Sequence, residues 1–199
     1  MVIEPTSRGV LVTGASRGVG AATATAFASR GDRVVVHYRG AVDRANAVRA
    51  SLSGDGHAVV GGDVADPAQV AAIADAAIAA LGRVDVLVNN AAMFAESPVR
   101  GSRRIGHSLL ETGYDEWVDV WRRTIAVNLL GPANLSYLVA RHMIDTEPAA
   151  TLPRGRIVNI GSRGAYRGEP EVPAYGGARP ACTRWASPWR SHSARTASP

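Results

Sequence analysis

The sequence predicts an α/β protein built on a doubly wound parallel sheet, and three observations support this prediction. Short apolar runs rich in β-branched residues alternate with longer alanine-rich segments at helical spacing between residues 9 and 175. A glycine-rich loop separates the first apolar run from the first helical segment, and polar residues follow the later runs. Strands and helices that alternate in this way form right-handed crossovers, which give a parallel sheet covered on both faces.

The predicted elements follow one another in regular order. Five apolar runs are expected to be strands: residues 10–12, 34–36, 58–60, 84–88 and 157–160. Four segments are expected to be helices: approximately residues 18–30, 42–52, 67–81 and 115–145. Asp66 followed by Pro67 is typical of a helix N-cap with proline at the first helical position. Gly31 and Gly82 each end a helix before the next strand.

Composition limits the class of protein. A chain of 199 residues with 46% hydrophobic and 20% charged residues is typical of one soluble domain. No run approaches the roughly 18 apolar residues of a membrane span, so no membrane association is expected. The single cysteine, Cys182, excludes an internal disulfide and favours a reducing compartment, which predicts a cytoplasmic protein.

The positive charge of the chain does not indicate a nucleic-acid partner. The formal net charge is +5, but residues 179–199 contain four arginines and no acidic residue, which leaves 5 − 4 = +1 for the rest. A nucleic-acid surface would concentrate charge on a folded face or within a known motif. No nucleic-acid partner is therefore expected. No metal site is expected either.

The loop after the first predicted strand reads Thr13-Gly-Ala-Ser-Arg-Gly-Val-Gly20 and opens the first predicted helix. Glycines allow a sharp turn and a close approach to phosphate, while the helix N-terminus supplies free N–H groups and positive potential. The alternative is a structural turn, but a strand before the loop and a helix after it favour a dinucleotide site. The candidate cofactor-binding residues are Gly14, Ser16, Arg17, Gly18, Val19 and Gly20.

The end of the second predicted strand indicates which dinucleotide is bound. A site for NAD usually carries an acidic residue there, which holds the ribose 2′-hydroxyl. The run His37-Tyr-Arg-Gly40 carries none, and Arg17 and Arg39 are placed to bind a 2′-phosphate instead. The alternative is two solvated surface arginines. The sequence thus favours NADP over NAD.

Two further polar groups follow predicted strands. Asp63 and Val64 come after the third strand, and Asn89, Asn90 and Ala91 come after the fourth. Either group alone could serve a turn. Ligands in doubly wound folds bind at the carboxyl ends of strands, so we expect Asp63, Val64, Asn90 and Ala91 to contact the cofactor.

With these motifs in order, the chain resembles the short-chain dehydrogenases/reductases, in particular 3-oxoacyl-carrier-protein reductases and pteridine reductases. The resemblance covers residues 8 to about 179 and includes Asn128 in Val-Asn-Leu, Ser162 after Ile157-Val-Asn-Ile-Gly, and Tyr175. It implies a Rossmann NADP-binding domain, here over residues 1–178, and a small carbonyl or alcohol substrate. It also implies that this chain lacks the last helix and strands of the family, and that its members form homo-oligomers.

The resemblance assigns roles to four residues. Tyr175 would exchange a proton with the substrate oxygen during hydride transfer, Ser162 would hold that oxygen, and Asn128 would anchor a water chain. A phenol titrates near pH 10, so this chemistry needs a neighbouring positive charge. The family supplies a lysine four residues after the tyrosine. This chain contains no lysine, and Arg179 stands at that position. Since arginine is not a conservative replacement there, reduced turnover is expected.

The tail, residues 179–199, shows no helical or strand pattern and is expected to be an aberrant, disordered basic segment. If its codons are read one base earlier and the free wobble bases are taken as GC-rich, the string becomes GMHALGQSLAVALGPHGIA, an apolar helix with a Gly-Pro stop. In that frame four residues gain apolar side chains at helical spacing: Cys182, Trp185, Trp189 and Ser193. We hypothesise a base lost near codon 179; the alternative is a divergent tail. Sequencing the source DNA across codons 175 to 200 tests this hypothesis.

Two functions from different classes stay open at this point. The first is an NADP-dependent oxidoreductase that acts through Tyr175. The second is a non-catalytic dinucleotide-binding protein, inactive through truncation and loss of the lysine. Residues 93–113 form a long connection whose three arginines either bind an anionic substrate or are solvated.

Overall fold

The computed structural model describes residues 7–94, 106–146, 155–169 and 171–185. These residues pack into two compact units. The first unit contains the described residues up to Ala92 and those from Gly131 to Ile160; the second contains those from Met93 to Leu130 and from Gly161 onward. One domain over residues 1–178 was expected. Within the second unit, the helices of residues 93–130 pack with the helices that follow residue 160.

The first unit contains the predicted parallel sheet. Its strands are β1 (Gly9–Val12), β2 (Arg33–Tyr38), β3 (Ala58–Gly61), β4 (Val86–Asn89) and β5 (Arg156–Asn159). Their order is β3-β2-β1-β4-β5, and every adjacent pair is parallel. The chain leaves β1 toward β2 and β3 and then returns to β4 on the other side of β1. The carboxyl ends of β1 and β4 therefore form the topological switch point at which such sheets bind ligands.

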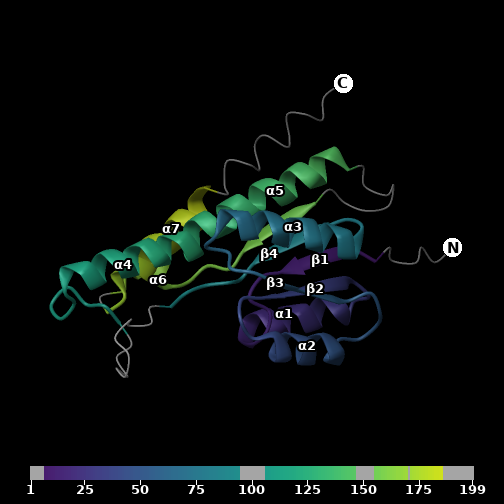
Figure 1. Cartoon of the computed structure of the whole chain (residues 1–199), viewed down its shortest axis with the longest axis horizontal. Helices are drawn as coiled ribbons and strands as arrows, with labels where there is room; N and C mark the ends of the chain where they lie inside the picture. Colours follow the sequence, from purple (N-terminus) through teal and green to yellow (C-terminus); the bar gives the residue numbers. More distant parts are fainter. Residues whose placement is uncertain (1–6, 95–105, 147–154, 170, 186–199) are drawn as a thin grey trace. The chain divides into compact units, whose positions relative to one another are not determined.

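Four helices cover this sheet: α1 (Gly18–Ala28), α2 (Val42–Ser51), α3 (Pro67–Leu81) and α5 (Gly131–Asp145). Helices α1 and α2 lie on one face, and α3 and α5 lie on the other (Figure 1). Val10, Val12, Val34 and Val36 pack toward α1 and α2. The residues between them along each strand point to the opposite face, and Leu11 is also fully buried. The doubly wound prediction is confirmed.

Local sequence signals correctly predicted both ends of α3. The Asp66 carboxylate accepts hydrogen bonds from the backbone N–H groups of Ala68 and Gln69, and Pro67 occupies the first helical position of α3. Gly82 follows the last residue of α3 with φ +72°, a conformation that favours glycine. The predicted N-cap and stop of this helix are confirmed.

The second unit consists of helices. They are α4 (Tyr114–Ile125), the π-helical segment η1 (Ala126–Leu130), α6 (Gly164–Arg167) and α7 (Pro173–Trp185). The predicted single helix over 115–145 is therefore three segments, because a π-helical turn separates α4 from α5. Helix α7 packs against α4, η1 and α6.

Helix α7 also corrects the prediction for the tail. Regular structure was expected to stop at residue 178, but α7 continues to Trp185. Sequence reasoning ended the regular structure too early because the residues after Tyr175 are rich in Arg, Ser, Pro and Trp and show no helical pattern. Residues 186–199 lie outside the described part of the chain. Among the described residues, no helix has the length and apolar character needed to cross a membrane.

Candidate functional site

The glycine-rich loop after β1 is tightly packed at its two ends and open in the middle. A Cβ at Gly14, where φ is +63°, would lie 2.9 Å from the Cα of Ala91, and a Cβ at Gly20 would lie 2.6 Å from the Gly14 carbonyl oxygen. At Gly18, where φ is +57°, a Cβ would meet no described atom within 4 Å. The loop thus needs glycine for its turn and leaves space at Gly18 for a ligand.

Helix α1 begins at this open point. Its N-cap residue is Arg17, whose side chain makes no capping hydrogen bond. The N–H groups of a first helical turn have no partner within the helix, and they favour anions together with the helix dipole. The residues present therefore fit the pyrophosphate of a dinucleotide. Ser16 is half-buried here, and Val19 is exposed.

A hydrogen-bond network ties this loop to the residues after β4. The Thr13 hydroxyl accepts hydrogen bonds from the backbone N–H groups of Asn90 and Ala91, both at 3.0 Å. In return, the Asn90 side-chain amide donates to the carbonyl oxygens of Thr13 (2.8 Å) and Gly14 (3.1 Å). The predicted residues Asn90 and Ala91 therefore lie beside the glycine-rich loop, and Asn90 holds that loop in shape.

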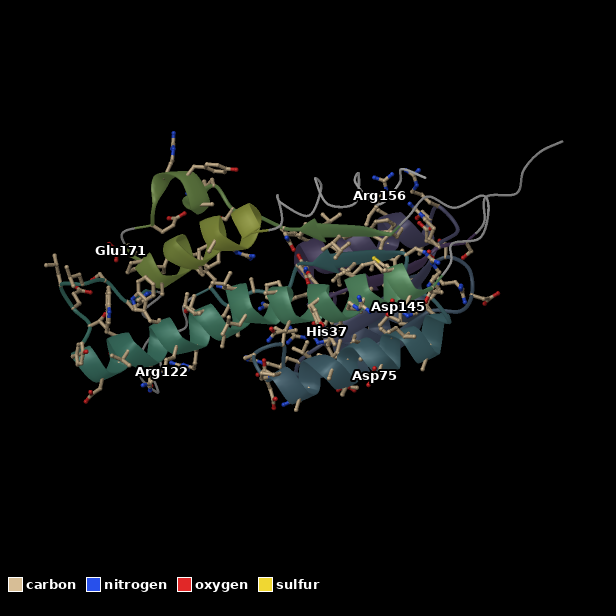
Figure 2. All side chains as sticks on the ribbon, turned by 90° about the horizontal axis from the view of Figure 1, so that it is seen from above. His37, Asp75, Arg122, Asp145, Arg156 and Glu171 are labelled. Atoms are coloured by element: carbon tan, nitrogen blue, oxygen red, sulfur yellow. The ribbon has the colours of Figure 1, made fainter. Side chains whose placement is uncertain are left out.

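His37 fixes the same loop from β2, a role that the sequence did not reveal. Its Nδ1 accepts a hydrogen bond from the Gly14 N–H at 3.1 Å, so the proton lies on Nε2, which donates to the Gly62 carbonyl oxygen at 3.0 Å. Figure 2 labels His37, whose side chain is only 1% exposed. Burial lowers its pKa to about 4, since the low-dielectric core disfavours the charged ring.

The other predicted cofactor residues lie in the same unit. Arg17 and Arg39 are both exposed and can reach a ligand in solvent. Asp63 is half-buried, and its carboxylate accepts a hydrogen bond from the Ala65 N–H at 2.9 Å. Val64 is buried, and its carbonyl oxygen lies so close to Gly131 that a Cβ there would come within 2.5 Å.

The predicted catalytic residues lie in the second unit, and two of them meet on α7. The Arg179 guanidinium carbon lies 5.2 Å from the centre of the Tyr175 ring, over its face. Arg179 is only 4% exposed, while Tyr175 is half-buried. Phe94 contacts the tyrosine ring edge-on, with centroids 5.0 Å apart. The Arg179 cation therefore packs on the face of the Tyr175 ring.

The two glycines between Tyr175 and Arg179 allow α7 to pack closely. A Cβ at Gly177 would lie 3.2 Å from the Trp121 ring of α4. A Cβ at Gly176 would lie 3.1 Å from the backbone nitrogen of Glu169. Small residues at these positions bring α7 against its neighbours and leave Tyr175 and Arg179 on another side of the helix.

Asn128 lies in η1 and is fully buried. Its Oδ1 accepts a hydrogen bond from the Met93 N–H at 2.8 Å, and its Nδ2 donates to the Met93 carbonyl oxygen at 2.9 Å. The side chain therefore fixes the backbone of Met93. The expected role of Asn128 as the anchor of a water chain stays a prediction.

Ser162 precedes α6 and is half-buried. Its Oγ accepts a hydrogen bond from the Gly164 N–H at 3.3 Å, which holds the hydroxyl close to the backbone. The hydroxyl keeps its own hydrogen for donation, so it can hold a substrate oxygen. The three arginines predicted in the long connection, at positions 100, 103 and 104, lie outside the described residues.

An apolar hollow of about 500 Å³ lies on the second unit. It is lined by residues of α4 and η1: Tyr114, Trp117, Val118, Trp121, Arg122, Ile125 and Leu130. None of the predicted catalytic residues lines this hollow, so we do not assign the substrate to it.

A doubly wound sheet with a glycine-rich loop at its switch point is typical of dinucleotide-binding proteins. The family described as short chain dehydrogenase matches residues 8–197. The chain belongs to this family. The match extends beyond residue 179, where the resemblance was expected to end.

Named relatives support the assignment. Galactitol 2-dehydrogenase from Agrobacterium fabrum is 34% identical over 83% of this chain and 56% of its own length. D-Threitol dehydrogenase from Mycolicibacterium smegmatis is 36% identical over 78% of this chain and 52% of its own. A 3-oxoacyl-[acyl-carrier-protein] reductase from Synechocystis is 32% identical over 87% and 63%, respectively. The chain thus spans about half to two thirds of the length of these relatives.

Solved structures agree with the fold. A short chain dehydrogenase from Burkholderia cenocepacia in complex with NADP matches with a TM-score of 0.71 and 32% identity over 89% of this chain and 65% of that chain. A putative short-chain alcohol dehydrogenase from Sinorhizobium meliloti matches with a TM-score of 0.76 and 29% identity over 96% and 69%.

Proposed function

We propose that this chain is an NADP-dependent oxidoreductase that transfers a hydride between nicotinamide and a small carbonyl or alcohol substrate. The observation that carries the proposal is the placement of the buried Arg179 guanidinium over the ring of Tyr175. This arrangement brings a buried cation next to the phenol that would exchange the proton.

The cofactor would lie along the open loop of the first unit. Gly18 leaves space for the pyrophosphate, and the first-turn N–H groups of α1 would bind it. Arg17 and Arg39 would pair with a 2′-phosphate through their planar guanidinium groups. Ser16, Val19, Asp63 and Val64 would complete the cofactor contacts; Asn90, Ala91 and His37 would hold the loop.

The residues of the second unit would supply the proton chemistry. A nicotinamide held there would supply or accept the hydride. The Tyr175 hydroxyl would give a proton to the substrate oxygen in reduction and take it back in oxidation. The Ser162 hydroxyl would hold that oxygen by a hydrogen bond and stabilise its developing charge. Asn128 would position this machinery by fixing Met93.

The function is tested by hydride transfer in the purified full chain. We expect NADPH to form, with absorbance at its characteristic wavelength, when the protein is mixed with NADP and galactitol or D-threitol, the alcohols named by two relatives. Binding of NADPH without turnover of these alcohols, or of a panel of small ketones with NADPH, would instead indicate a non-catalytic dinucleotide-binding protein.

Removal of the two loop arginines is expected to weaken NADPH binding selectively. The double variant Arg17→Ala/Arg39→Ala loses charge-assisted hydrogen bonds to the 2′-phosphate, so the Kd for NADPH should rise about 10- to 100-fold. The Kd for NADH should stay within about threefold, which calorimetry can establish. Arg30→Ala is the matched control, because Arg30 is an exposed arginine that follows α1. Equal loss of affinity for both dinucleotides would contradict the predicted preference.

Restoration of a lysine at position 179 is expected to raise turnover. Arg179→Lys places a compact ammonium with three donors next to Tyr175 in place of a planar fork, so kcat should increase about tenfold. Single-turnover hydride transfer with the best alcohol of the panel measures the effect. An unchanged or lower kcat would show that this chain has adapted its proton chemistry to arginine.

A further inference from the structure

His107 of the second unit holds the start of α7 through two hydrogen bonds from a distant part of the sequence. The His107 N–H donates a hydrogen bond to the Glu171 carbonyl oxygen at 2.8 Å. In the other direction, the Ala174 N–H donates to the His107 Nε2 at 3.0 Å across a sequence separation of 67 residues. Ala174 is the second residue of α7, so its N–H has no partner within the helix. His107 therefore acts as a helix cap that comes from another segment.

The chemical state of His107 follows from this bond. Since Nε2 accepts a hydrogen, the proton of the neutral ring lies on Nδ1, for which the described residues offer no hydrogen-bond partner. The ring is fully buried and packs edge-to-face on Trp117, with centroids 5.9 Å apart. Burial lowers the pKa of His107, and the negative charge of Glu116 on α4 opposes this effect. A neutral ring is the form that capping requires.

The segment before His107 is shaped for the same contact. Gly106 has φ +138°, a conformation that L side chains rarely adopt. A Cβ there would lie 2.7 Å from the Glu171 carbonyl oxygen, the same oxygen that accepts from His107. Gly106 thus permits the close approach that lets His107 reach α7. Figure 2 labels Glu171, which lies just before the start of α7.

We propose that His107 is a positioning residue for Tyr175, which it orients by capping the first turn of α7. Tyr175 directly follows Ala174, so the hydrogen bond to Nε2 fixes the backbone from which the phenol projects. This inference rests on the proposed function of Tyr175 as the proton donor.

Protonation of His107 would release the contact, because an imidazolium Nε2 is a donor and would face the Ala174 N–H. It would also place a positive charge at the positive end of the helix dipole. Among the charged residues of α4, which packs on the ring through Trp117, Glu116 favours protonation of His107.

The test compares two substitutions of His107 in the full chain. His107→Leu removes the acceptor, whereas His107→Gln retains an acceptor oxygen. We expect His107→Leu to speed hydrogen exchange of the Ala174 amide about fivefold or more, with amides of β1 and β4 unchanged. The kcat should fall about 10- to 100-fold, while the Kd for NADPH stays constant. His107→Gln should restore both the exchange rate and most of kcat.

The matched control is His57→Leu, which removes an imidazole that accepts from the Val34 N–H in the first unit at 3.0 Å. It should leave exchange at Ala174 unchanged. Unaltered exchange in His107→Leu, or a loss of kcat that glutamine does not rescue, would overturn the proposal.

One readout depends neither on activity nor on folding of the leucine variant. A ¹⁵N spectrum of the wild-type imidazoles near neutral pH should show His107 protonated at Nδ1 only; a proton on Nε2 would overturn the proposal. If the wild-type chain shows no turnover, the exchange data still decide whether His107 caps α7. Capping without turnover would reject the proposed function while leaving the contact established.

Discussion

Replacement of Tyr175 with phenylalanine is expected to lower hydride turnover by about 10²- to 10⁴-fold, the usual contribution of a positioned general acid or base. The substitution removes the exchangeable proton and keeps the ring that packs against Phe94 and Arg179. The fold and the affinity for NADPH should therefore stay unchanged. Single-turnover kinetics and calorimetry on the same preparation measure the two quantities.

Tyr166→Phe is the matched control for this experiment. Tyr166 lies on α6 in the same unit, but its side chain is 88% exposed. Its turnover should stay within about twofold of wild type, as for a surface substitution away from the site. If Tyr175→Phe retained more than half of the wild-type turnover, Tyr175 would not be the proton donor.

The second large effect is a loss of the free energy of unfolding at acidic pH, which arises from His37. The folded pKa of about 4 lies below the ordinary value of 6.5, so the unfolded chain takes up the proton first as the pH falls. The stability that the neutral ring provides is present above about pH 6.5 and is lost progressively as the pH approaches 4. The full difference corresponds to about 3 kcal/mol in the free energy of unfolding, and about 2 kcal/mol of it is lost between pH 7 and pH 5.

His37→Asn is expected to remove this pH dependence. At pH 7 the variant should be less stable by about 2 kcal/mol, since an asparagine side chain is too short to bridge Gly14 and Gly62. Between pH 7 and pH 5 it should lose about 2 kcal/mol less than wild type in urea unfolding followed by circular dichroism. Equal pH dependence of the two proteins would contradict the assigned role. His57 is a half-buried imidazole that accepts a hydrogen bond from β2, the strand that carries His37. His57→Asn should cost less stability at pH 7 than His37→Asn.

Much of the fold could be predicted because its signals are local. The β-branched runs predicted all five strands of the sheet, and Asp66 with Pro67 predicted the start of α3. A buried parallel strand needs an apolar side chain at nearly every position, and a cap needs its oxygen within the first turn. Both requirements are met by neighbouring residues, so the sequence displays them directly.

The candidate site could be predicted only in part. Glycines at positions 14, 18 and 20 predicted a loop that can approach phosphate. Gly14 and Gly18 do have the positive φ angles that such a turn requires. The resemblance to the family paired Tyr175 with a cation four residues later, and the two groups do meet. The sequence shows His37 only as part of the end of the second strand, where no acidic residue is present. Nothing in its neighbourhood shows that its two nitrogens join Gly14 to Gly62.

The sequence by itself determined the parallel sheet, the family to which the chain belongs and the residue types at its cofactor loop. Only the tertiary structure decided the division into two units, the extension of α7 past Pro180 and the capping of that helix by His107. Periodicity reports whether a residue is buried, but not which distant backbone group it meets there. A hydrogen bond across 67 residues depends on the packing of both segments, and that packing exists only in the folded chain.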